Sequence, residues 1–145
     1  VQAFQMLKGL NVELWICGSG DAKESIETAS KNDPRIKFFG LVDSNTAEFC
    51  LPILSEFIKV PYHKIEISSG ECNKNLSVVE EVWSSLLECG ATRDSLLINL
   101  GGGMVTDLGG LAAATYMRGI RYVNIPTSLL AMVDGDLPIR SASSL

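Results

Sequence analysis

The sequence predicts an α/β fold with a Rossmann-like, mostly parallel five-stranded sheet and helices on both of its faces. Short apolar runs, typical of buried strands, alternate along the chain with longer segments typical of helices. Glycine, aspartate or threonine directly follows several of these runs, and the ligands of such sheets bind beyond the carboxyl ends of the strands. The expected strands are residues 12–17, 36–42, 64–68, 95–100 and 122–125.

The helices are predicted from their caps and their breaking residues. The expected helices are residues 21–31, 47–57, a segment from Ser77 to Gly90, residues 105–117, and a short apolar segment that ends at Val133. Ser44 or Asn45 can cap the second helix, and Pro52 must kink or restart it. A capping box at Ser77–Glu80 opens the third helix. Arg118 is placed in the last turn of the fourth.

The composition fits one domain with a core, because the chain has 145 residues of which 46% are hydrophobic. The net charge of −5, without a basic stripe, argues against nucleic acid as a partner. No apolar run is long enough to cross a membrane and no signal peptide is visible, so a cytoplasmic location is expected. The four cysteines are expected to be reduced thiols, and His63, the only histidine, a surface loop residue.

Three consecutive glycines, Gly101 to Gly103, directly follow an almost wholly apolar strand. Glycine loses more conformational entropy on folding than any other residue, so a run of three requires a reason. One interpretation is close approach of the backbone to a pyrophosphate at the N-terminus of the next helix, where free N–H groups and the helix dipole favour an anion. The other is a tight turn. Asp107 similarly is either a favourable charge near that N-terminus or a contact to the ligand.

Two further features each have a structural and a functional interpretation. Asp43 ends a strand about twenty residues after Gly20, where dinucleotide-binding folds place an acid for the ribose hydroxyls, although Lys23 replaces the third glycine of that motif. Arg118 and Arg121 follow the helix after the glycines. They either compensate the dipole at its C-terminus or bind a phosphate group.

The run from Gly101 to Asp134 contains G-G-G-M-V-T-D-L-G-G-L-A-A-A-T-Y-M-R-G and then P-T-S-L-L-A-M-V-D. It closely resembles the 3-dehydroquinate synthase family, which typically reads G-G-G-x-x-x-D-x-x-G-F-x-A-x-x-x-x-R-G and P-T-T-L-L-A-x-V-D. The segment D-S-N-T at 43–46 resembles the family's first NAD contact, and S-G-E-C-N-K at 69–74 resembles its P-x-G-E-x-x-K loop. The resemblance covers residues 43–134.

The resemblance implies NAD as the cofactor and assigns a role to each matching residue. It implies that Asp43, Asn45, Glu71 and Lys74 contact the adenosine part, that Gly102, Gly103 and Met104 cradle the pyrophosphate, and that Asp107, Thr127, Ser128 and Leu130 line the nicotinamide side. Asp134 would reach the substrate pocket. Arg118 would bind the phosphate of the substrate, across the interface of a homodimer.

The implied reaction, a step of the shikimate pathway, converts the sugar phosphate DAHP to 3-dehydroquinate and phosphate. NAD oxidises one hydroxyl transiently, phosphate is eliminated, hydride returns and the ring closes, while a divalent metal, zinc or cobalt, polarises the substrate. In the family S-S-V-G-G-K-T follows V-D, but here a divergent tail, residues 135–145, follows Asp134. The catalytic lysine and the metal-binding helical domain are therefore missing, so this chain alone is expected to hold no metal and to be inactive.

Residues 10–42 instead resemble part of the donor-binding domain of a GT-B glycosyltransferase, on V-E-L-W-I-C-G-S-G-D and D-P-R-I-K-F-F-G-L-V. A junction near Val42 and Asp43 would then lie within one α/β domain spanning residues 1–145. The E-x7-E motif of those enzymes is absent, so transferase activity is not expected. Two alternatives stay open: a related cyclase or glycerol-dehydrogenase-like enzyme, and a non-catalytic α/β fusion.

Overall fold

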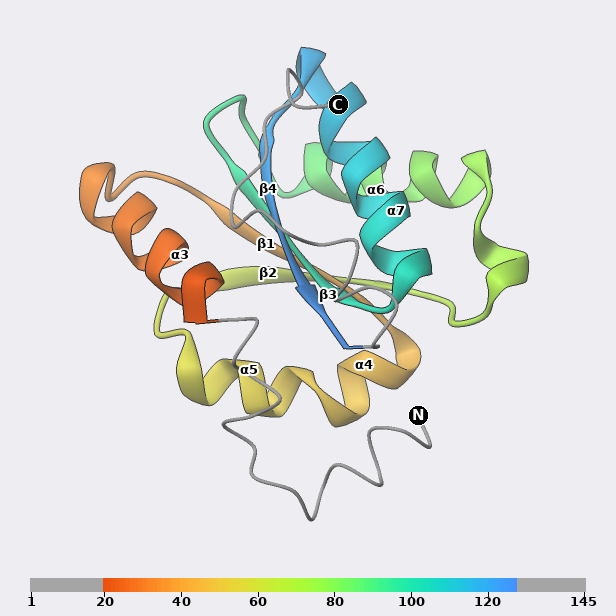
Figure 1. The fold of residues 1–145 in the computed structure, drawn as a ribbon. Coiled ribbons are helices and arrows are strands. Elements are labelled where there is room, and N and C mark those ends of the chain that lie inside the picture. Colours follow the sequence, from red (N-terminus) through yellow and green to blue (C-terminus); the bar gives the residue numbers. More distant parts are fainter. Residues whose placement is uncertain (1–19, 128–145) are drawn as a thin grey trace.

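The fold is a parallel sheet between two layers of helices (Figure 1). The structure, a computed structural model, describes residues 20–127. The strands of this part are β1 (Phe38–Asp43), β2 (Tyr62–Ile67), β3 (Leu96–Gly101) and β4 (Arg121–Pro126), in the order β2-β1-β3-β4. All three neighbouring pairs are parallel, so the predicted architecture is confirmed. The described sheet has four strands, and the fifth expected strand, residues 12–17, lies outside the described residues.

Strand β3 is an inner strand of the sheet, and all six of its residues are buried. Its side chains alternate between the two faces, as in any strand. Leu96, Ile98 and Leu100 belong to the core cluster on one face, whereas Leu97 belongs to the cluster on the other. Burial on both faces explains why this segment is almost continuously apolar rather than alternating.

Helices α3 (Gly20–Asn32), α4 (Ser44–Phe49) and α5 (Leu51–Phe57) cover one face of the sheet (Figure 1). Ile26 of α3 and Leu54 of α5 belong to the same buried cluster as Ile98 of β3. The helix is interrupted between α4 and α5, and Pro52 lies in the first turn of α5. The predicted restart at this proline is therefore confirmed, since proline has no N–H to continue a preceding helix.

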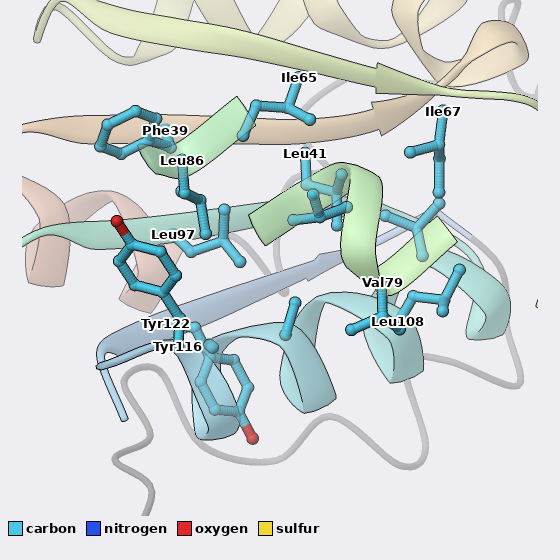
Figure 2. Close-up of a cluster of buried hydrophobic side chains, with 14 of the residues drawn as sticks. Phe39, Leu41, Ile65, Ile67, Val79, Leu86, Leu97, Leu108, Tyr116 and Tyr122 are labelled. Carbon is cyan, nitrogen blue, oxygen red and sulfur yellow. The ribbon is translucent and has the colours of Figure 1, made fainter. Parts of the chain in front are cut away.

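Helices α6 (Leu76–Glu88) and α7 (Gly103–Thr115) cover the other face (Figure 1). Figure 2 shows the core of this layer, in which Leu41 and Leu97 of the sheet meet Val79 of α6 and Leu108 of α7. The indole Nε1 of Trp83 donates to the carbonyl oxygen of Ala112 at 3.3 Å, which links the two helices directly.

Helix α7 approaches β3 closely at Gly109. A Cβ on Gly109 would overlap the side chain of Asn99, which is fully buried. Asn99 pairs in register with Asn124 of β4, and its Nδ2 donates to Asn124 Oδ1 at 3.0 Å. Asn99 Oδ1 is the one buried side-chain oxygen or nitrogen within residues 20–127 that has no hydrogen-bond partner. The absence of a side chain at Gly109 is therefore what lets α7 pack against this amide.

Two of the predicted helix boundaries on this face are wrong. Helix α6 begins after Asn75, whose side chain accepts the N–H of Val78 at 3.1 Å, so the capping box proposed at Ser77–Glu80 does not form. Ser77 lies one residue inside the helix, where its hydroxyl cannot serve as the cap. The predicted helix 105–117 is shifted, because α7 starts at Gly103 and ends two residues before Met117.

Arg118 does not lie in the last turn of α7, as predicted, because α7 ends at Thr115. It belongs to a separate 3-10 turn, η2 (Tyr116–Arg118). Met117 and Arg118 have φ of 49° and 68°, and Gly119 follows with φ of 111°. Left-handed backbone at two consecutive non-glycine residues is uncommon, and it turns the chain sharply away from the helix axis.

His63 lies in strand β2 and not in a loop, so this prediction is also corrected. Its ring stacks on Phe39 of β1, with ring centroids 5.2 Å apart and an interplanar angle of 26°. The residue is exposed, as predicted for a surface position. The start of this strand was predicted two residues too late, at Lys64, because the apolar alternation that marks β2 only becomes clear from that residue onward.

Candidate functional site

The carboxyl ends of the four described strands lie at one edge of the sheet, because the strands are parallel. From this edge β1 continues into α4 on one face, whereas β3 continues into α7 on the opposite face (Figure 1). Neighbouring strands whose connections diverge in this way form the switch point where open α/β sheets bind their ligands. Asp43 and Gly101, the last residues of β1 and β3, therefore flank the expected ligand position.

The three consecutive glycines have three different environments. A Cβ on Gly101 would lie 2.6 Å from the Cβ of Val105, so this glycine serves the packing of the first turn of α7. Gly102 is the N-cap of α7 and has no side chain that could accept a helix N–H. A Cβ on Gly103 would meet nothing within 4 Å, and its φ is not positive. Neither packing nor backbone conformation requires glycine at position 103, whereas a ligand approaching the backbone would.

The first turn of α7 offers backbone N–H groups rather than side chains. The N–H groups at the start of a helix have no partner within the helix and carry the positive end of its dipole. Met104 is 7% exposed and its side chain belongs to the core, so only its backbone can contact a ligand. The hydroxyl of Thr106 donates back to the carbonyl oxygens of Gly102 and Gly103, each at 3.2 Å. This arrangement suits an anion.

Asp43 lies at the carboxyl end of β1, as predicted, and it also caps α4. Its Oδ1 accepts the N–H of Thr46 at 2.8 Å, and the hydroxyl of Thr46 accepts the N–H of Asp43 at 3.0 Å. The predicted caps, Ser44 or Asn45, are wrong because α4 already begins at Ser44, three residues before the expected start at residue 47. The reciprocal bonds hold the carboxylate at the strand end without help from a ligand.

A short 3-10 helix, η1 (Glu71–Asn73), lies between β2 and α6, and two predicted adenosine contacts are Glu71 in this helix and Lys74 directly after it. Gly70 precedes it with φ of 107°, a conformation that favours glycine. The N–H of Asn73 donates to the carbonyl oxygen of Gly70, and the N–H of Lys74 donates to that of Glu71, both at 3.0 Å. The turn thereby presents Glu71 and Lys74 as exposed side chains.

Lys74 also reaches across to α7. Its Nζ lies 2.7 Å from Oδ2 of Asp107, 33 residues further along the chain. The hydrogen bond with Asp107, together with the charge of that carboxylate, raises the pKa of Lys74 above its ordinary value. The family resemblance implies that Lys74 lies at the adenosine side and Asp107 at the nicotinamide side of the cofactor. In the structure the two side chains are in direct contact.

A pocket of ≈ 260 Å³ opens beside this ion pair, between α6 and α7. The residues that line it are Lys74, Asn75, Leu76, Val79, Asp107, Leu108 and Leu111. Its lining is mainly apolar, and two of its leucines, Leu76 and Leu111, are exposed. The volume is below the usual range for small-molecule sites, so the pocket alone cannot enclose a dinucleotide. No sequence feature predicted this pocket.

Strand β4 brings one further predicted contact to the same edge. The N–H of Thr127 donates to the carbonyl oxygen of Gly101 at 3.0 Å, so Thr127 lies next to the glycine run. Three other predicted site residues, Ser128, Leu130 and Asp134, lie outside the described residues. Besides Asp107, which lies on α7, twelve site residues were predicted. Eight of these twelve lie at the carboxyl edge of the described sheet. Those eight are Asp43, Asn45, Glu71, Lys74, Gly102, Gly103, Met104 and Thr127.

Arg118 is separated from all of these residues. Helix α7 starts at the ligand edge, and its 13 residues extend about 20 Å before the chain reaches η2 at the opposite end of the sheet (Figure 1). Arg118 is exposed there and cannot reach a ligand held at Gly103 of the same chain. Arg121, at the start of β4, donates from Nη2 to the carbonyl oxygen of Asp94 at 3.0 Å and so anchors a loop.

Residues 20–127 contain neither a cluster of metal ligands nor a membrane-spanning helix. No three His, Cys, Asp or Glu side chains of this part cluster closely enough to hold a metal ion. None of its helices has both the length and the apolar composition needed to cross a membrane. Its three cysteines, Cys50, Cys72 and Cys89, are free thiols.

Comparison with known sequences identifies close relatives. The family model described as 3-dehydroquinate synthase N-terminal matches residues 64–142, more than half of the chain. The 3-dehydroquinate synthase of Parabacteroides distasonis is 48% identical over 101 residues, which make up 68% of this chain and 28% of that protein. The chain therefore spans less than a third of the length of this curated relative.

Comparison with solved structures finds related cyclases. A structure of 2-deoxy-scyllo-inosose synthase complexed with carbaglucose-6-phosphate, NAD+ and Co2+ superimposes with a TM-score of 0.65 at 26% identity, over 73% of this chain and 31% of that one. The 2-epi-5-epi-valiolone synthase ValA of Streptomyces hygroscopicus subsp. jinggangensis 5008, with NAD+ and Zn2+ bound, gives 0.63 at 30% identity, over 70% of this chain and 29% of that one.

Proposed function

The chain belongs to the 3-dehydroquinate synthase family, and from this membership we propose that its described residues form the NAD-binding part of such an enzyme. The observation that carries the proposal is Gly103, which has open space where a side chain would lie and no conformational need for glycine. It stands at the N-terminus of α7, next to the switch point of the sheet.

The pyrophosphate of NAD would lie against the first turn of α7. Gly102 and Gly103 let the backbone approach the phosphate oxygens, and the free N–H groups of this turn, including that of Met104, donate to them. The global charge of the chain is −5, so attraction of the anion depends on these local donors and on the helix dipole. Binding of the pyrophosphate by these backbone groups does not require a nearby arginine.

The adenosine part would extend toward the ends of β1 and β2. Asp43 is held by its bonds to Thr46, so its carboxylate is already positioned to accept hydrogen bonds from the ribose hydroxyls. Asn45 lies in α4, which follows β1, and Glu71 lies in η1, which follows β2. A carboxylate at this place also repels a 2′-phosphate, so NAD is preferred to NADP.

The nicotinamide would lie near Asp107 and Thr127, with Ser128 and Leu130 completing that side and Asp134 reaching the substrate. When bound, NAD supplies a transient acceptor for hydride. The whole enzyme would convert DAHP to 3-dehydroquinate and phosphate, in the biosynthesis of aromatic amino acids. Its divalent metal, zinc or cobalt, would be held by residues outside 20–127, because no cluster of ligands lies in that part.

We also infer a homodimer and a cytoplasmic location. Arg118 lies about 20 Å along α7 from Gly103, so its predicted role in binding substrate phosphate requires that it serve a partner's site. The free thiols of Cys50, Cys72 and Cys89 fit a reducing compartment. A cyclase with another substrate is the second candidate, favoured by the superposition on 2-deoxy-scyllo-inosose synthase and ValA. The higher identity to curated 3-dehydroquinate synthases favours the first.

Saturation-transfer NMR of the full chain with NAD tests the proposal. The expected result is transfer to the adenine protons of NAD, and weaker transfer to those of NADP because of the charge of Asp43. A chain that melts cooperatively but shows no transfer at millimolar NAD would reduce the assignment to common ancestry. Equal transfer to NAD and NADP would contradict only the role proposed for Asp43, and not the proposal that the chain binds NAD.

A further inference from the structure

We propose that Ser44, Ser69 and Asn73 are positioning residues that hold the η1 turn at the cofactor site, an inference that rests on the proposed function. This turn contains Glu71 and is directly followed by Lys74. It has only three helical residues, too few to be stable without outside support. The side chains of the turn are exposed apart from the half-buried Asn73, so core packing does not fix it either.

A continuous chain of hydrogen bonds supplies this support. The hydroxyl groups of Ser44 and Ser69 lie 2.9 Å apart, although these residues are 25 positions apart in the sequence. The N–H of Ser69 donates to Ser44 Oγ at 3.4 Å. The side-chain Nδ2 of Asn73 donates to the carbonyl oxygen of Ser69 at 2.8 Å. The chain of bonds therefore runs from the start of α4 into the η1 turn.

The two ends of this chain matter for the site. Ser44 directly follows Asp43, whose carboxylate is fixed by the cap of α4. Asn73 directly precedes Lys74, whose ammonium group pairs with Asp107 on α7. The η1 turn is thus attached on one side to the end of β1 and on the other to α7. These attachments set the position of Glu71 relative to Asp43, the two carboxylates proposed for adenosine.

The direction of the bonds shows which groups are needed. Because Ser44 Oγ accepts the N–H of Ser69, the Ser44 hydroxyl hydrogen is free to go to Ser69 Oγ. Alanine at either position removes the bond between the hydroxyls, whereas threonine at position 69 keeps a hydroxyl. A turn that is ordered before the cofactor arrives loses less entropy on binding, so these bonds should raise affinity without touching the cofactor.

The test compares Ser44→Ala, Ser69→Ala and the double variant in the full chain. The readout is amide hydrogen exchange at Asn73 and Lys74, whose N–H groups close the η1 turn. Each single variant should exchange roughly two- to tenfold faster at these amides, the range that one modest hydrogen bond provides. NAD should bind more weakly by a similar factor. The double variant should lose no more than Ser44→Ala, because Ser44→Ala already removes both bonds of its hydroxyl to Ser69, including the one that Ser69→Ala removes.

Two further variants separate positioning from general stability. Ser69→Thr should restore slow exchange and NAD affinity. Ser85→Ala, which removes a hydroxyl bonded within α6 to the carbonyl oxygen of Glu81, should change neither. The melting temperature should stay at the wild-type value in all of these variants, because Ser44 and the turn lie outside the core.

Unchanged exchange at Asn73 and Lys74 in both single variants would overturn the inference, as would additive losses in the double variant. Faster exchange with unchanged NAD affinity would overturn the link to the cofactor. The exchange measurement needs no ligand. If wild type itself fails to bind NAD, the proposed function falls, while the exchange rates still decide whether Ser44 and Ser69 hold the turn.

Discussion

Asn99 of β3 lies directly under Gly109 of α7, so that a single methyl group added to the glycine would overlap the asparagine side chain. Asn99 is fully buried and joined to Asn124 on the neighbouring strand. Strand β3 ends at Gly101, the first of the three consecutive glycines. Strand β4 ends directly before Thr127, a predicted nicotinamide contact that donates its N–H to Gly101. The contact between Gly109 and Asn99 therefore positions α7, the helix whose N-terminus is proposed to hold the cofactor.

Gly109→Ala is expected to destabilise the fold by about 1–3 kcal/mol, the usual cost of overfilling a packed interior. Asn99→Ala in the same chain should remove most of that cost, because the added methyl group then occupies the space left by the amide. Urea unfolding of the two single variants and the double variant measures the coupling. Losses that simply add would show that Asn99 is not what restricts position 109.

Asp43 has two roles that substitution can separate. Asp43→Ala should cost about 1 kcal/mol of stability, because it removes the cap of α4, and should also weaken NAD binding. Asp43→Ser keeps a side-chain oxygen for the N–H of Thr46, so its melting temperature should stay near wild type. The shorter, uncharged serine should still lose NAD affinity. Wild-type affinity in Asp43→Ser would rule out a contact between this carboxylate and the ribose.

The ion pair between Lys74 and Asp107 should be visible in the titration of the lysine. Its hydrogen bond and charge raise the pKa of Lys74 above the ordinary value of 10.5, so Asp107→Asn should lower it. A raised lysine pKa contributes stability that is fully present below the unfolded pKa and is lost as pH rises through the folded one. The stability that the ion pair contributes is therefore lost only at alkaline pH. The size of this contribution should be small at any pH because both side chains are exposed.

NMR of the lysine Cε and Hε signals checks this titration between about pH 9 and 12, on both sides of the ordinary pKa of 10.5. Asp94→Asn, at a loop away from Lys74, is the control and should leave the Lys74 curve in place. An unshifted curve in Asp107→Asn would mean that the contact is not populated in solution.

Cys50 and Cys72 should differ strongly in reactivity. Burial, and secondarily the negative charge of Asp43, raise the pKa of the Cys50 thiol to about 12. Cys50 is 3% exposed, whereas Cys72 lies on the surface. Since the thiolate is the nucleophile, iodoacetamide at pH 8 should modify Cys72 first and Cys50 only as urea unfolds the chain. Mass spectrometry of the peptides follows both, and equal rates in native buffer would contradict the burial of Cys50.

The strands were predictable because each is a short apolar run or, in β2, a short alternating run, with local punctuation. The segment S-L-L-I-N-L predicted β3 within one residue, and its proximity to three glycines predicted the ligand edge. The restart at Pro52 depends on the covalent structure of proline and is equally local. Asn99 carried a usable signal that was missed: a polar residue inside an otherwise apolar strand must find a partner, and a nearby strand holds Asn124.

Features that depend on distant contacts could not be predicted. Asn75 and Ser77 are both good caps two residues apart, and only the path of the chain from η1 selects Asn75. The contact of Lys74 with Asp107 depends on where α6 and α7 lie on the sheet. The position of Arg118 at the far end follows from the length of α7, which the sequence predicts correctly, although shifted by two residues, but cannot relate to the ligand edge.

Calorimetry with NAD on wild type and Gly103→Ala tests the central claim most directly. Position 103 has free space and helical backbone, so alanine should leave the melting temperature unchanged or raise it, since alanine is the better helix former. The same methyl group would intrude on a pyrophosphate at the backbone, so NAD affinity should fall at least about tenfold, the loss of some 1.4 kcal/mol. Equal NAD affinity in the two proteins would contradict the account.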